Sequence, residues 1–144
     1  VNREVTVGGA QIIAIRNAKV RDAETGTPRS KVILNGRYSI GSWVADATVT
    51  RYGSYRYNVG DVAGVPAANG NVDQEFSPET YLDLGVSYLS GGAWRIDVLV
   101  QNVLNKYPDK YVLGNRASGI NPYSFIAPNG ASGRFVQGSL TYSF

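Results

Sequence analysis

The stretch "YLDLGVSYLSGGAWRIDVLVQN", residues 81–102, decides the fold of this chain. Large apolar residues occupy every second position on both sides of a Gly-Gly pair, and most of the remaining positions are polar or glycine. A period of two is typical of strands that have one apolar and one polar face. The pair Gly91-Gly92 fits a two-residue hairpin turn, because glycine readily adopts the positive φ that such turns need. The stretch therefore predicts a strand over Tyr81–Ser90, a tight turn, and a strand over Ala93–Asn102.

The same alternation continues on both sides of this hairpin. It predicts further strands over Ala10–Arg21, Ser30–Ile40, Trp43–Thr50 and Phe135–Phe144, of which the first is the least regular. Gly41-Ser42 forms a second tight turn between two of them. No segment shows the three-and-four spacing of an amphipathic helix of useful length. We therefore expect an all-β protein, an antiparallel up-and-down meander of about six strands.

Long connections alternate with the tight turns. They cover Asp22–Arg29, Asn58–Pro78 and Val103–Gly133. In an up-and-down sheet, alternate connections lie at the same end, so the tight turns should share one end and the long loops the other. Long loops are uncommon in compact soluble domains, whereas short turns at one end and long loops at the other are typical of outer-membrane barrels.

Aromatic residues gather beside the predicted tight turns. The four that flank the turns are Tyr38, Trp43, Tyr88 and Trp94. Tyr142 and Phe144 end a strand that runs toward the same end. Such rings favour the headgroup layer of a membrane and would form an aromatic girdle, although they could also fill a soluble core beneath the sheet. A second girdle at the far end would comprise Tyr52, Tyr55, Tyr57, Phe76 and Tyr81.

Composition excludes several function classes. The 144 residues include no Cys and no His, which removes disulfides, thiolate and imidazole metal ligands, cysteine nucleophiles and histidine-based triads. The net charge is only +3 and the 14 basic residues are scattered, whereas a dedicated nucleic-acid binder more often carries a basic stripe. We expect no enzyme activity, no cofactor and no nucleic-acid partner.

Two acidic groups deserve comparison with catalytic sites. Asp83 and Asp97 lie on the polar faces of neighbouring predicted strands and could form a carboxylate pair for acid–base chemistry. Pairing of these carboxylates with Arg95 or Arg37 is the more ordinary expectation.

The loop from Asn58 to Glu75 also carries oxygen ligands suited to Ca²⁺, but their spacing matches no EF-hand, and a solvated turn-rich loop is expected.

The segment "RYGSYRY", residues 51–57, interleaves basic and aromatic residues. This pattern fits an interfacial girdle with extended arginines, a substrate contact in an outer loop, or base stacking, in that order of preference. The candidate ligand contacts are Tyr52, Tyr55, Tyr57 and, in the loop Asn115–Ser132, Arg116.

Three segments together resemble the C-terminal part of a TonB-dependent outer-membrane receptor. "YLDLGVSYLSGGAWRIDVLVQNVLNKYPDKY" resembles the penultimate hairpin and the "xNLFDxxYxD" segment that follows it. "NPYSFIAPNGASGRFVQGSLTYSF" resembles the last external loop and closing strand, and "GTPRSKVILNGRYSIGSWVADATVTRYGSY" resembles an earlier hairpin. The resemblance covers roughly residues 20–144. It departs from the family at Val103-Leu104-Asn105, where Leu-Phe-Asp is commoner, and at the irregular start.

The resemblance implies that residues 1–144 are the last quarter or so of a plugged barrel of roughly 22 strands in the bacterial outer membrane. It implies uptake of a scarce nutrient, such as an iron–siderophore complex, driven by a TonB-type energy transducer that acts through a plug region missing here. It also implies that Leu140, Tyr142 and Phe144 form a signal for the barrel-assembly machinery, where the simpler alternative is that they only face lipid. The isolated fragment, with open strand edges and a lipid-facing side, is expected to self-associate.

Two alternatives stay open at the level of sequence. One is a small independent outer-membrane barrel with a structural or adhesive role, for which eight strands would be needed. The other is a soluble β-barrel binding module of the oligonucleotide-binding type, whose core would lie on the apolar faces.

Overall fold

The computed structural model describes residues 3–7, 10–15, 23–58, 73–110, 122–124 and 126–143. The chain forms two compact units, each built from three separate segments. Unit 1 comprises Val1–Arg29, Gly53–Ser77 and Pro108–Gly130. Unit 2 comprises Ser30–Tyr52, Pro78–Tyr107 and Ala131–Phe144.

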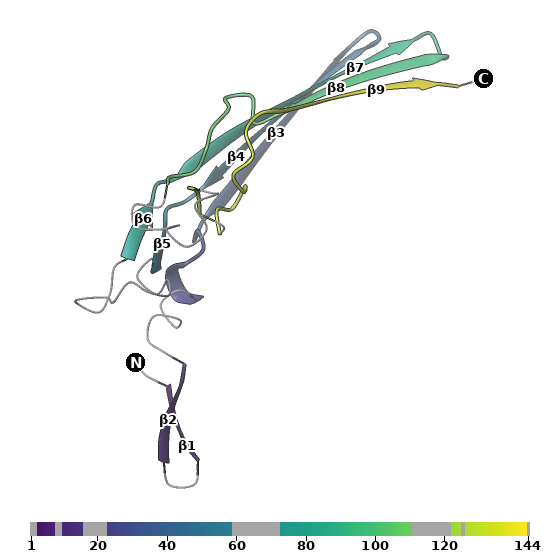
Figure 1. Ribbon diagram of the computed structural model, residues 1–144. Coiled ribbons are helices and arrows are strands. Elements are labelled where there is room, and N and C mark those ends of the chain that lie inside the picture. The colour runs from purple at the N-terminus through teal and green to yellow at the C-terminus, as the bar shows by residue number, and fades with distance from the viewer. Residues whose placement is uncertain are drawn as a thin grey trace. The chain divides into compact units, whose positions relative to one another are not determined.

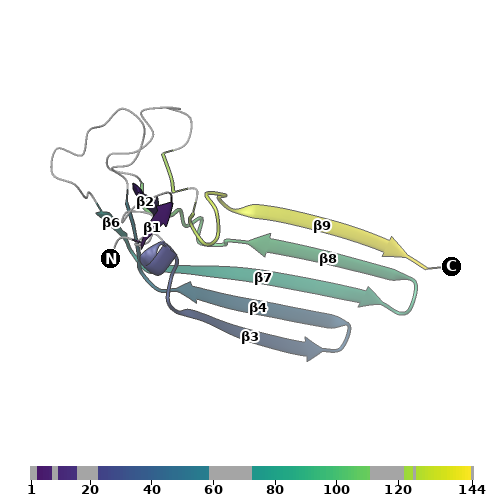
Figure 2. The same ribbon diagram turned by 90° about the horizontal axis from the view of Figure 1, so that it is seen from below.

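Unit 2 is a five-stranded antiparallel sheet with the strand order β3-β4-β7-β8-β9 (Figures 1 and 2). Its strands are β3 (Lys31–Ile40), β4 (Trp43–Tyr52), β7 (Glu79–Ser90), β8 (Trp94–Gln101) and β9 (Phe135–Tyr142). Each strand pairs with the strand of this sheet that follows it in sequence, so the sheet is an up-and-down meander. The all-β class and the antiparallel up-and-down meander predicted from sequence are confirmed. The meander has five strands and not about six, because the first predicted strand, which begins at Ala10, belongs to a separate two-stranded sheet.

The pairing register keeps the apolar positions of all five strands on one face. Val86 of β7 lies opposite Ala45 of β4 on one side and Val98 of β8 on the other. Val98 in turn lies opposite Gly138 of β9. Because side chains alternate between faces, this register gathers most apolar residues on one face and most polar residues on the other, as the sequence predicts. The exposed apolar residues on the polar face include Ile33, Leu89 and Phe135.

The tight turns lie at one end of the sheet, where Figure 2 shows both hairpins closing. Gly41-Ser42 is the predicted two-residue turn between β3 and β4, and Gly41 has a φ of 55°. The second turn is longer than predicted, because Ser90 pairs with Trp94 and leaves the three residues 91–93 between the strands. Gly91 and Gly92 have φ values of 48° and 107°, so both glycines are used for conformations that other residues rarely adopt.

Unit 1 contains two short hairpins and a short helix at residues 23–25. One hairpin pairs β1 (Arg3–Val7) with β2 (Ala10–Ile15), and the other pairs β5 (Tyr55–Asn58) with β6 (Asp73–Phe76). Tyr55 and Phe76 lie opposite each other, with ring centroids 4.7 Å apart and planes only 7° apart. Both rings are buried, so among the residues that the structure describes they form the apolar centre of the second hairpin.

Several sequence predictions need correction here. The strand expected over Ala10–Arg21 is present over Ala10–Ile15, and the rest of it lies outside the described residues. Its partner β1 was not predicted. The hairpin of β5 and β6 was also missed, and all of β6 lies where only a long loop was expected. The first of these segments carries little alternation, and the strands of the second hairpin have only four residues each, too few for a period of two to stand out.

The second aromatic girdle is wrong for four of its five proposed members. Tyr55 and Phe76 are buried against each other in unit 1. Tyr52 and Tyr81 lie on the polar face of the sheet, where Tyr52 is opposite Glu79 and the Tyr81 hydroxyl donates a hydrogen bond to Glu79 over 2.6 Å. Successive strand residues face opposite sides of the sheet. Tyr52 and Tyr81 occupy positions that alternate with the apolar ones, so their rings lie on the polar face.

Close packing follows the end of β8, where Gly133 lies against Tyr107 and Asn105. A Cβ at position 133 would overlap the Tyr107 hydroxyl and lie 2.9 Å from Asn105 Oδ1. We therefore expect Gly133→Ala to lower the free energy of unfolding by about 1–3 kcal/mol, as overpacking does elsewhere. Urea unfolding followed by circular dichroism would measure it. Gly36→Ala is the matched control, because its Cβ would meet nothing closer than a backbone oxygen at 4.0 Å; equal losses in both variants would contradict this account.

Candidate functional site

The apolar face of the sheet is its largest chemical feature, and it is exposed. Members on all five strands have between 39% and 66% of their surface accessible. They include Val32, Leu34, Tyr38, Ile40, Trp43, Leu84, Val86, Trp94, Ile96, Val98, Val136, Leu140 and Tyr142. An apolar surface of this extent is typical of a contact surface for lipid or for another apolar partner, because soluble monomers rarely expose one.

Aromatic rings form a band on the apolar face next to the tight turns. Trp43 packs on Tyr88 with ring centroids 4.7 Å apart, and Trp94 packs on Tyr142 at 4.5 Å. Tyr38, on β3, lies on the same face and is 66% exposed. The structure thus places the four girdle residues expected from sequence on one face and near one end of the sheet. Their indole N–H and phenol O–H groups sit on an otherwise apolar surface, as in rings that lie at a membrane–water interface.

The residues of the proposed assembly signal are partly described. Leu140 lies opposite Ile96, and Tyr142 lies opposite Trp94, so both belong to the apolar face of β9. Phe144 lies outside the described residues.

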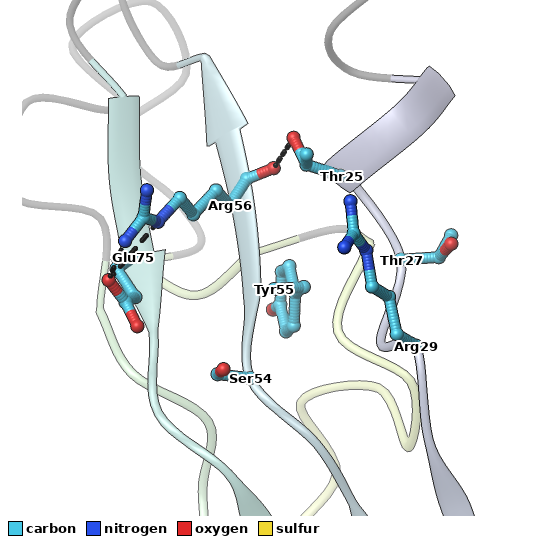
Figure 3. Close-up of a pocket in the computed structure, with 7 residues that line it drawn as sticks. All are labelled: Thr25, Thr27, Arg29, Ser54, Tyr55, Arg56 and Glu75. Carbon is cyan, nitrogen blue, oxygen red and sulfur yellow. Dashed lines mark hydrogen bonds and ion pairs between the residues drawn. The ribbon is translucent and has the colours of Figure 1, made fainter.

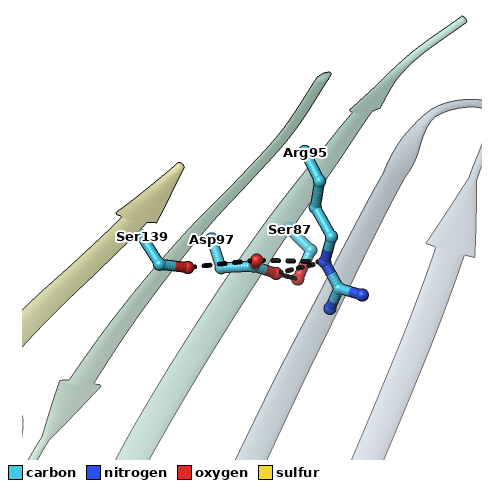
Figure 4. Close-up of polar contacts among 4 residues, drawn as sticks. All are labelled: Ser87, Arg95, Asp97 and Ser139. Atoms are coloured by element: carbon cyan, nitrogen blue, oxygen red, sulfur yellow. Dashed lines mark hydrogen bonds and ion pairs between the residues drawn. The ribbon is translucent and has the colours of Figure 1, made fainter. Parts of the chain in front are cut away.

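Asp97 is the centre of a hydrogen-bond network on the polar face of the sheet. The carboxylate accepts hydrogen bonds from Ser87 Oγ over 2.5 Å, from Arg95 Nε over 2.9 and 3.0 Å, and from Ser139 Oγ over 3.3 Å (Figure 4). These partners come from three neighbouring strands, β7, β8 and β9. Asp97 therefore links the strands on this face rather than standing ready for proton transfer.

Asp83 does not pair with Asp97. Asp97 lies opposite Ser87, four residues further along β7, and Asp83 instead accepts a hydrogen bond from the backbone N–H of Asn102 over 2.7 Å. The two carboxylates do not lie opposite each other, so the carboxylate-pair hypothesis is wrong. Arg95 pairs with Asp97, as expected. Arg37 instead pairs with Asp46 at 3.3 Å, and not with Asp83 or Asp97 as predicted.

A polar turn follows β8, and its hydrogen bonds to the backbone were not predicted from the sequence. Asn102 is buried and has a φ of 50°. Its side-chain amide donates to the carbonyls of Lys106 and Ser132 over 2.8 and 3.2 Å and accepts from the Lys106 N–H over 2.8 Å. Asn105 also has a φ of 50°, and its side-chain oxygen accepts from the Arg134 N–H over 2.9 Å. The available signal was the pair of asparagines three apart directly after a strand, because asparagine tolerates this conformation and bonds to nearby backbone.

Unit 1 contains a polar pocket of about 280 Å³. Its lining, drawn in Figure 3, consists of Thr25, Thr27, Arg29, Ser54, Tyr55, Arg56 and Glu75. Arg56 lies opposite Glu75 and donates to its Oε2 from Nε over 3.2 Å and from Nη2 over 2.8 Å. Thr25 Oγ1 donates to the Arg56 carbonyl over 3.1 Å. The pocket thus combines hydroxyl groups, one ion pair and a second guanidinium.

The candidate ligand contacts fall in different places. Tyr55 lines the pocket of unit 1, but it is only 3% exposed. Tyr57, on β5, lies opposite Gln74 in the same unit. Tyr52 lies on the polar face of the sheet, with Lys31 Nζ 5.2 Å from its ring centroid. Arg116 lies outside the described residues. Of the four candidates, Tyr55 is therefore the one that the pocket of unit 1 includes.

Among the residues that the structure describes, no set of ligands supports the calcium hypothesis. Glu75 is engaged by Arg56, and most of the loop Asn58–Glu75 lies outside the described residues. Within the described part of the chain, no three acidic residues come together as a metal site. The same part contains no helix long and apolar enough to cross a membrane.

A scan of protein-family models finds no match to this chain. Searches of curated proteins and of solved structures find no match either.

Proposed function

We propose that this chain is part of the wall of a bacterial outer-membrane β-barrel. The observation that carries the proposal is the exposed apolar face of the five-stranded sheet, banded by Trp43, Tyr88, Trp94 and Tyr142 at the tight-turn end. Its strands of 8–12 residues match the length that a tilted strand needs to cross the hydrocarbon layer, about 9–11 residues. The polar face would then line the barrel interior.

We further propose that the barrel belongs to a TonB-dependent receptor that takes up a scarce nutrient such as an iron–siderophore complex. The resemblance of residues 20–144 to the end of that family supports this finer step. In this proposal the sheet supplies the barrel wall, and the segments between β4 and β7 and between β8 and β9 supply ligand-catching loops. The energy transducer would act on a plug region elsewhere in the receptor, and the barrel-assembly machinery would bind Leu140, Tyr142 and Phe144.

A soluble binding module is disfavoured by the same face. Such a module buries its apolar residues in a core, whereas Leu34, Ile40 and Leu140 are each more than 60% exposed on a sheet with two unpaired edge strands.

Cysteine accessibility in the native membrane tests the proposal, because this chain contains no cysteine of its own. Ser139 and Leu140 are neighbours on β9 and face opposite sides of the sheet. We expect Leu140→Cys to react with a lipid-soluble maleimide and to resist a charged thiosulfonate reagent. We expect Ser139→Cys, the matched control, to react with the charged reagent. Equal reaction of both cysteines with the charged reagent would mean that the apolar face does not contact lipid.

A further inference from the structure

We propose that the pocket of unit 1 binds an oxyanion, a carboxylate or phosphate group carried by a larger ligand. The binding itself is independent of the membrane proposal, which supplies only its biological context as a ligand-catching feature of an outer loop. The argument rests on the charge balance of the pocket, on its hydrogen-bond donors and on its volume.

The charge balance of the pocket favours an anion. Two arginines and one glutamate line it. Arg56 and Glu75 neutralise each other through hydrogen bonds of 2.8 and 3.2 Å from one guanidinium to one carboxylate oxygen. Arg29 forms no ion pair with any residue that the structure describes. Figure 3 shows the Arg56 side chain directed toward Glu75 and Arg29 on the other side of the pocket. Among the residues that the structure describes, the Arg29 charge is therefore not neutralised and can attract an anion.

The donors suit an oxyanion. The Arg29 guanidinium carries five N–H groups in a planar fork that matches a carboxylate or phosphate with two parallel hydrogen bonds. Thr27 and Ser54 add hydroxyl groups to the same lining. Thr25 already donates its hydroxyl hydrogen to the Arg56 carbonyl, which fixes the wall of the pocket beside the ion pair.

The floor of the pocket is rigid and its volume is small. Tyr55 is 3% exposed and stacked on the fully buried Phe76, so its ring is held in place. A volume of about 280 Å³ lies at the lower limit of small-molecule sites, roughly 300–1,000 Å³. The pocket therefore accommodates one anionic group of a ligand rather than a whole siderophore-sized molecule.

Calorimetric titration of the full chain in an uncharged detergent tests this proposal, with inorganic phosphate and succinate as probes. We expect both anions to bind and to compete with each other. Arg29→Ala should weaken binding about tenfold to a hundredfold, the size of a charge-assisted hydrogen-bond pair, and Arg29→Lys should restore part of the affinity. Arg134→Ala is the matched control, because it removes the same charge from an exposed position outside the pocket lining.

The Glu75→Gln variant should bind anions more tightly, whereas Arg29→Ala should bind them more weakly. It removes the carboxylate that neutralises Arg56 while keeping the side-chain shape, so we expect anion binding to tighten about threefold or more. A merely structural role for Glu75 would weaken binding or leave it unchanged. Arg29 and Glu75 are both exposed, so we expect each variant to fold, and circular dichroism of each variant checks this.

Phosphatidic acid in the same uncharged micelles distinguishes the source of the anion. Arg29-dependent binding of the lipid without binding of the free anions would identify a lipid headgroup as the ligand, and binding of the free anions would identify a soluble one. The proposal is overturned if no anion binds, or if Arg29→Ala and Arg134→Ala weaken binding equally. Neither result would bear on the cysteine accessibility of β9, so failure of the pocket and failure of the membrane proposal are separable.

Discussion

Replacing Asn102 with alanine is expected to lower the free energy of unfolding by about 2–4 kcal/mol. The Asn102 side chain makes three hydrogen bonds, to Lys106 N–H, Lys106 C=O and Ser132 C=O, and it is only 3% exposed. Alanine would leave these backbone groups without their partner, which costs about 1–3 kcal/mol for each one that water cannot reach. Alanine also tolerates a φ of 50° less well than asparagine does, which adds about 1 kcal/mol.

Two further variants separate these contributions. Asn102→Gly relieves the backbone strain and loses the hydrogen bonds, so it should be less harmful than Asn102→Ala by about 1 kcal/mol. Asn35→Ala, which removes one exposed contact with Thr48, should cost less than about 1 kcal/mol. Chemical unfolding followed by tryptophan fluorescence provides the measurement. If Asn102→Ala and Asn35→Ala cost the same, the buried turn does not stabilise the end of β8.

If the sheet lies in a membrane, as proposed, placing arginine at position 98 is expected to destabilise the protein by about 2–4 kcal/mol. Val98 lies near the middle of β8 on the apolar face, opposite Val86 and Gly138. A lipid-facing arginine near the bilayer midplane costs this much in outer-membrane barrels, because the charge must be stabilised by water or headgroups drawn into the hydrocarbon layer. Urea unfolding from phospholipid vesicles would give the difference in free energy.

The neighbouring position is the control for this experiment. Leu99 faces the polar side, where its methyl carbon lies 3.9 Å from the position that a Cβ of residue 85 would take. Asp46 and Asp83 line the same cavity as Leu99. Leu99→Arg places the same charge beside acidic groups, so we expect a change below about 1 kcal/mol. A larger loss for Leu99→Arg than for Val98→Arg would reverse the assignment of the two faces.

The sheet was predictable from sequence because its signal is local and repeated. Alternation such as Trp94, Ile96, Val98 and Val100 fixes which residues share a face, and glycines at 41 and 91 mark where the chain turns. The number of residues in the second turn was not predictable, since Ala93 can end a turn or begin a strand. The four-residue strands β5 and β6 were lost for a related reason, because a period of two cannot be recognised over so few positions.

The site residues were predictable only where they belong to the repeated pattern. Trp43 and Tyr88 lie in alternating strands, and their contact follows from the register. The pocket lining joins residues 25–29 with β5 and β6, and no sequence pattern states that such distant segments meet. The Tyr55 ring illustrates the difference: the sequence marked it as a ligand contact, but only the packing on Phe76 shows that it is a buried floor.

The order of strands in the sheet has a consequence for the folding kinetics. The β3–β4 and β7–β8 pairs join residues close in sequence, so closing them costs little chain entropy and they can form within microseconds. The β8–β9 pair must instead close the long connection of residues 102–134, and contacts of high sequence separation form later. We therefore expect β9 to join after the two hairpins have formed. Until it does, the backbone groups along the outer side of β8 stay open to mispairing, and this interval is when the chain would depend most on a chaperone.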